Sequence, residues 1–189
     1  MPARSILLAA LLFAAMPANA QNAGAPGNER GAAIDKLLGA LKSAPSEEIA
    51  GPLEHQIRQL WLNSGTPAVT LLMSRGMREM KADAQQDAIE DFSAAITLDP
   101  SMAEAYHQRA IARFAAGDAQ GAIADVQATL LREPRSFAAF ETLAAIAESR
   151  KDWKGAYTAW QKVLEIAPKT PHGQERLKDL RRHALGEEA

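Results

Sequence analysis

The stretches AIEDFSAAITLDP at 88–100, AIADVQATLLREP at 122–134 and AYTAWQKVLEIAP at 156–168 each begin with Ala and end with Pro. They follow one another at an interval of 34 residues. A repeat of this length, kept without a slip in register, is typical of stacked pairs of helices. The sequence therefore predicts an all-α fold whose regular part consists of three tandem units. These units are 69–102, 103–136 and 137–170.

Each unit divides into two amphipathic helices that are joined by a short turn. We expect these turns at Ala82-Asp83, Gly117-Asp118 and Lys151-Asp152. Gly117 can end a helix in the left-handed conformation, and Asp118 can cap the helix that follows. The proline of each unit comes just after the second helix, where a missing backbone N–H ends the hydrogen-bonding pattern.

The first 20 residues have the pattern of a cleavable secretory signal peptide. Arg4 gives a positive start, residues 5–15 are almost wholly apolar, and Ala18-Asn19-Ala20 is a cleavage site of small residues. The apolar run is shorter than the roughly 20 residues that span a bilayer. We expect cleavage after Ala20, no membrane anchor thereafter, and a soluble protein of a bacterial periplasm. An uncleaved anchor is the alternative.

The segments outside the units have weaker patterns. Residues 21–30 lack periodicity and are expected to be a flexible lead-in. Residues 31–66 predict a helical hairpin that has the shape of a unit but not its residues. Ser46 is expected to cap its second helix, which either kinks at Gly51-Pro52 or restarts there. Residues 171–189 predict a polar capping helix and a tail.

Composition narrows the function classes. The chain has 189 residues, of which 47% are hydrophobic and 5% aromatic, and this favours close-packed helices over a β-sandwich. Its net charge of −2 gives no general attraction to nucleic acid. The absence of cysteine excludes disulfides and thiol catalysis. No hydrolase, zinc-protease or phosphate-loop motif is present, so we expect no enzyme, cofactor or metal site.

The repeated positions resemble those of the tetratricopeptide repeat (TPR) family. That signature has a large residue at position 4, small at 8, Ala at 20, aromatic at 24, small at 27 and Pro at 32. The units supply Leu72, Gly76, Ala88, Phe92, Ala95 and Pro100; Tyr106, Ala110, Ala122, Val126, Thr129 and Pro134; and Phe140, Ala144, Ala156, Trp160, Val163 and Pro168. The aromatic residue of position 11 is missing. The resemblance implies a right-handed α-solenoid with a C-terminal capping helix.

By the same resemblance, positions 2, 5, 9, 12 and 13 of each unit line a concave groove that binds a peptide or helix of a partner. These residues are Thr70, Met73, Met77, Met80 and Lys81; Glu104, His107, Ile111, Phe114 and Ala115; and Ala138, Glu141, Ala145, Glu148 and Ser149. Family members that clamp a C-terminal carboxylate have Lys and Asn where this chain has Met73 and Met77, so we expect no such clamp. Three acids, Glu104, Glu141 and Glu148, would favour a basic partner.

Three interpretations of the methionine stripe stay open. Met73, Met77 and Met80 could pack against the N-terminal hairpin, form an adaptable surface for a partner, or bind Cu(I) together with His107. The four histidines have no metal-ligand spacing. The basic residues Lys178, Arg181 and Arg182 read as the solvated face of the cap.

The sequence thus predicts a non-enzymatic scaffold or adaptor for another protein. The alternative is a self-associating structural module of an envelope complex. The sequence leaves open the partner, the oligomeric state and whether the N-terminal hairpin covers the groove.

Overall fold

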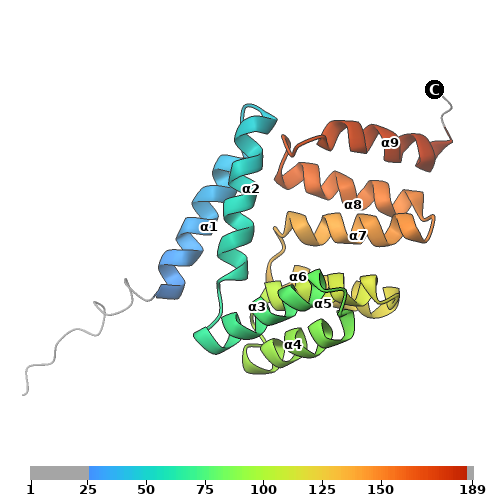
Figure 1. Ribbon diagram of the computed structural model, residues 1–189. Helices are drawn as coiled ribbons and strands as arrows, with labels where there is room; N and C mark the ends of the chain where they lie inside the picture. The colour runs from blue at the N-terminus through green and yellow to red at the C-terminus, as the bar shows by residue number, and fades with distance from the viewer. Residues whose placement is uncertain (1–25, 187–189) are drawn as a thin grey trace, which may run out of the picture.

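The computed structural model describes residues 26–186, and this range forms nine α-helices and no strand (Figure 1). The all-α prediction is confirmed. The predicted signal peptide lies outside the described residues. The helices are α1 Pro26–Lys42, α2 Glu47–Leu62, α3 Pro67–Lys81, α4 Gln85–Leu98, α5 Ala103–Ala115, α6 Ala119–Arg132, α7 Phe137–Ser149, α8 Trp153–Ile166 and α9 Gly173–Leu185.

The three predicted units are the helix pairs α3–α4, α5–α6 and α7–α8, which stack in chain order with α9 against α8 (Figure 1). The turn inside each pair has one left-handed residue at the same repeat position: Asp83, Gly117 and Lys151, with φ of 62°, 86° and 60°. The aspartates after two of these turns cap the next helix. Their Oδ1 atoms accept from the backbone N–H of Gly121 and Gly155 at 2.8 and 2.9 Å.

Small residues let the helices of each unit approach closely, as the repeat pattern predicts. Ala88, Ala122 and Ala156 on the second helices have no exposed surface. A Cβ added to Gly76 would lie 2.7 Å from Cε1 of Phe92, so no larger residue fits there without displacing the ring.

Ion pairs join the helices of the first two units. Asp91 and Asp125 are buried on α4 and α6, and they accept hydrogen bonds from Arg75 and Arg109 on the preceding helices. The third unit has Leu143 at the position of the arginines and a buried alanine at that of the aspartates. Its two helices are therefore joined at this point by apolar contact alone.

The N-terminal hairpin consists of α1 and α2, and the start of α1 differs from what the sequence predicted. α1 begins at Pro26, inside the expected flexible lead-in, because proline suits the first turn of a helix and Glu29 favours its dipole. α2 continues through Pro52, so it does not restart there. Ser46 does occupy the N-cap of α2, but its hydroxyl makes no capping bond to the backbone.

The N-terminal hairpin does not stack on α3 as a fourth unit. It stands across the ends of α7, α8 and α9 (Figure 1) and shares a core with α7 and α8, in which Trp61 packs against Phe137 at a centroid distance of 5.4 Å. The face of α3 that a preceding unit would cover is therefore bare. Leu71 is 65% exposed there, whereas Ala105 and Ala139 at the same repeat position are fully buried.

Candidate functional site

The concave face is formed by the first helices of the units. α3 lies beside α5, and α5 beside α7, so residues at equal repeat positions become neighbours on this face. α2 contacts α5, and it meets the first turn of α7 at Phe137 and Ala138. The predicted groove is therefore divided into a half that α2 covers and a half that stays open.

In the covered half, the predicted groove residues are engaged inside the protein. Ala138 is buried in the core that α2 shares with α7. The Glu141 carboxylate accepts two hydrogen bonds from Arg58 of α2, at 2.8 and 3.0 Å. The same guanidinium lies 4.6 Å from the ring centroid of Phe137. A ligand that used the Glu141 carboxylate would therefore have to compete with Arg58 for it.

His107 and Glu104 form a buried polar cluster. Nδ1 of His107 lies 3.3 Å from Oε1 of Glu104, and Nε2 lies 3.0 Å from the hydroxyl of Thr142. Glu104 also accepts from the amide of Gln108 at 2.7 Å. Both ring nitrogens of His107 are thus occupied, and neither is free to bind copper. Within residues 29–186, no group of three His, Asp or Glu side chains is arranged to hold a metal ion.

The methionine stripe divides between core and surface. Met73 is 1% exposed in a core formed mainly by α3, α4 and α5, which the N-terminal hairpin meets only at Leu62. Of the three interpretations, core packing holds for Met73, although the N-terminal hairpin contributes only Leu62 to that core. Met73 is buried by residues of α4 and α5. The hairpin takes little part, because it stands against the third unit. Met77 and Met80 line the edge of the same core and stay half-exposed.

The open half of the face is mostly apolar. We call it the open groove and define it by Met77, Met80, Ile111, Phe114 and Ala145, all of which are half-buried or exposed. Lys81, Ala115 and Ser149 lie at its exposed edge, and Thr70 lies near the start of α3. The carboxylate of Glu148 is bound by Arg176 of α9. All three acids that were expected to charge the groove are thus engaged within the chain.

Two kinds of residue that shape the site were missed in the sequence. Arg58 lies over the groove, but nothing in the repeat pattern points to it, because its partner Glu141 is 83 residues away in the sequence. The aspartates that bind Arg75 and Arg109 could have been predicted from their spacing in the sequence. They stand 16 residues after each arginine in two units, and both residue types are lost together in the third.

No family model matches the chain. A TPR repeat-containing protein of Rhizobium etli is 28% identical over 153 residues, which cover 81% of this chain and 75% of the relative. The TPR domain of Sgt2 from Aspergillus fumigatus superposes with a TM-score of 0.59 at 23% identity, over 66% of this chain and 87% of that domain.

A second solved structure is the first TPR of Spaghetti (RPAP3), which was determined with an HSP90 peptide bound. It superposes with a TM-score of 0.59 at 19% identity, over 64% of this chain and 97% of that one. The period, the signature residues and the stacked hairpins agree with these comparisons, so the chain has the fold of tetratricopeptide repeat domains and is similar in sequence to a TPR repeat-containing protein.

Proposed function

We propose that this protein is a non-enzymatic scaffold or adaptor whose open groove binds the apolar face of a peptide or helix from a partner protein. One observation carries the proposal. Apolar side chains at positions 9 and 12 of neighbouring helices stay accessible on the concave face, although α2 covers the rest of it. That the Spaghetti TPR was solved with a peptide bound supports this use of the fold.

The partner should carry an apolar stripe rather than a row of basic residues. The acids at groove positions suggest a basic partner when the sequence is read alone. In the structure such a partner would have to displace Arg58 from Glu141 and Arg176 from Glu148. Burial of apolar side chains against Met77 and Phe114 needs no such exchange, and flexible thioethers adapt to the shape of a bound side chain. We therefore assign the affinity to apolar contact.

We further propose that the protein is exported and acts in a bacterial periplasm. The signal-like pattern of residues 1–20 supports this location. None of the helices within residues 26–186 is long and apolar enough to cross a membrane. The mass of the protein purified from its host tests the proposal, because cleavage after Ala20 leaves Gln21 as the first residue. An intact N-terminus on the purified protein would contradict export by cleavage.

Self-association is the second candidate, and the bare face of α3 favours it. Leu71 is 65% exposed at a position that the following units bury against a neighbour. A second copy could cover this face, as repeat units cover one another. The two candidates thus place the contact on different faces of α3, and this makes them separable.

Two substitutions on α3 test the proposal. Met77→Glu puts a charge into the open groove and should weaken capture of the partner from a host extract by more than tenfold, because a buried carboxylate loses its hydration. Leu71→Glu makes the same charge change outside the groove and should leave capture intact. Equal capture by both variants would contradict groove binding. A concentration-dependent dimer in light scattering that Leu71→Glu removes would support self-association instead.

A further inference from the structure

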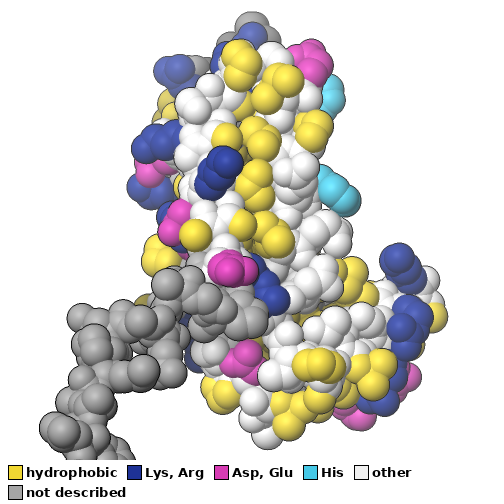
Figure 2. Space-filling model, turned by 90° about the vertical axis from the view of Figure 1, so that its left-hand side faces the viewer, with side chains coloured by type: hydrophobic (Ala, Val, Ile, Leu, Met, Phe, Trp, Pro, Cys, Tyr) yellow, Lys and Arg dark blue, Asp and Glu magenta, His cyan; other side chains and the backbone are white. Residues whose placement is uncertain are grey.

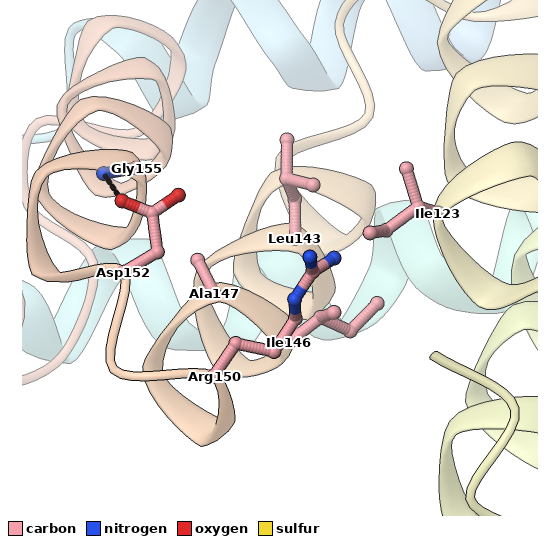
Figure 3. A pocket seen from close by; sticks show the side chains of 7 residues that line it. All are labelled: Ile123, Leu143, Ile146, Ala147, Arg150, Asp152 and Gly155. Carbon is pink, nitrogen blue, oxygen red and sulfur yellow. Dashed lines mark hydrogen bonds between the residues drawn. The ribbon is translucent and has the colours of Figure 1, made fainter. Parts of the chain in front are cut away.

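A cavity of about 290 Å³ opens between α6, α7 and the start of α8 (Figure 3). Its floor is formed by the apolar side chains of Ile123, Leu143, Ile146 and Ala147. Arg150, Asp152 and Gly155 complete the lining. The cavity lies at the C-terminal end of α7, whereas α2 contacts the N-terminal end. It is therefore separate from the part of α7 that the hairpin covers.

The sequence of the third unit explains why a cavity forms at this junction. α6 and α7 pack less closely than α4 and α5 at the preceding junction. Ile146 stands where the second unit has the small Ala112, so its larger side chain keeps α7 further from α6. Leu143 replaces Arg109, which donates a hydrogen bond to Ser93 of α4 at 3.1 Å and so joins its unit to the one before.

The rim of the cavity carries unpaired positive charge. In the part of the chain that the structure describes, the guanidinium of Arg150 makes no hydrogen bond or ion pair, and Lys151 and Lys154 nearby are exposed. Two acids lie close by: Glu148 is paired with an arginine, whereas Asp152 caps α8 and keeps one exposed negative charge beside the three cations. Asp152 accepts the N–H of Gly155 at 2.9 Å, and Glu148 is bound by Arg176. Figure 3 shows the Arg150 side chain extending toward Leu143 and Ile123 over the apolar floor.

We propose that this cavity binds one apolar side chain of an acidic segment of a partner protein, with a neighbouring carboxylate of that segment on Arg150. The volume suits a single large side chain rather than a cofactor, because ligand pockets are usually larger. The planar guanidinium matches a carboxylate with two parallel hydrogen bonds. This site is separate from the open groove, and its positively charged rim selects a negatively charged segment.

Short peptides test the site directly. The probe is acetyl-Ala-Glu-Phe-Glu-Ala-amide, titrated into the full mature chain and followed by NMR shifts of Ile123, Ile146 and Ala147. One buried ring and one ion pair should give a dissociation constant on the order of 1 mM. A peptide with Lys in place of Glu, and one with Ala in place of Phe, should each bind at least tenfold more weakly. Equal binding of the Lys peptide would overturn the proposal.

A matched pair of variants separates Arg150 from general attraction. Arg150→Gln should weaken the acidic peptide about fivefold to tenfold, whereas Lys154→Gln removes the same charge outside the lining and should change the affinity less than twofold. Equal losses in the two variants, or shifts that map away from the cavity, would overturn the proposal. Met77→Glu should leave this peptide unaffected, so failure of this site and failure of the open groove give different results.

Discussion

Lys151 occupies a backbone conformation that its side chain disfavours. Its φ of 60° lies in the left-handed region, where Gly117 stands at the same position of the preceding unit with φ of 86°. Lys151→Gly removes the clash of Cβ with the backbone and should raise the free energy of unfolding by about 0.5–1 kcal/mol. Urea denaturation of the variant measures this change.

Lys162→Gly is the control for this prediction, because it removes the same side chain from an exposed position in the interior of α8. Glycine in a helix lowers stability by about 1 kcal/mol relative to good helix formers. The two variants should therefore change stability in opposite directions. A loss of stability in both would show that the turn conformation of Lys151 carries no strain.

At the scale of helices, Glu54 gives α2 a pH-dependent contact. Burial raises the pKa of its carboxyl above the ordinary value of 4.5, although the hydrogen bond from the hydroxyl of Thr170 acts in the opposite direction. The folded protein thus holds this proton more tightly than the unfolded chain. The contribution of Glu54 to stability is therefore favourable at pH 4.5 and is lost as the pH rises through the folded-state pKa.

Glu54→Gln should consequently stabilise the protein at pH 7, because the amide keeps an acceptor for Thr170 without burying a charge. The difference between the variant and the native chain should shrink as the pH is lowered to 4.5. Guanidinium denaturation at several pH values between 4.5 and 7 measures it. A gain that does not depend on pH would contradict the assignment to this carboxyl.

The helices differ in how far the sequence reveals them. The units from α3 to α8 follow from local signals, since the turns and the prolines recur in all three units and the capping aspartates recur in two. The position of the N-terminal hairpin depends on contacts that no local pattern contains. Asp35 pairs with Arg135 100 residues away, and Glu54 meets Thr170 116 residues away. A degenerate unit was therefore expected where a crossing hairpin stands.

The same limit applies to the site. Positions 9 and 12 of the units are accessible, in agreement with the family pattern. At positions 2 and 5 of the second and third units, Glu104, His107 and Ala138 are buried and Glu141 is bound by Arg58 of α2. The polar network around His107 depends on the packing of α5 against α7, which supplies Thr142, and residue spacing alone could not distinguish it from an exposed lining.

At the scale of the whole molecule, the N-terminal hairpin joins distant parts of the stack. Its two helices contact α7 and α8 along their ends, and Glu47 accepts the N–H of His172 at 3.0 Å just before α9. The outer side of this hairpin carries hydrophobic side chains along its length (Figure 2). Ile49 on α2 is 51% exposed. The hairpin thus closes one half of the concave face and leaves the other half as the route to the groove.

Site-specific photocrosslinking in the native host tests this account most directly. A photoreactive aromatic residue replaces Met80 in the open groove, Ile111 beside it, or Leu131 on α6, which is 83% exposed outside the groove. The account predicts that positions 80 and 111 crosslink to the same partner protein and that position 131 does not. A partner that crosslinks from position 131 and from neither groove position would contradict it.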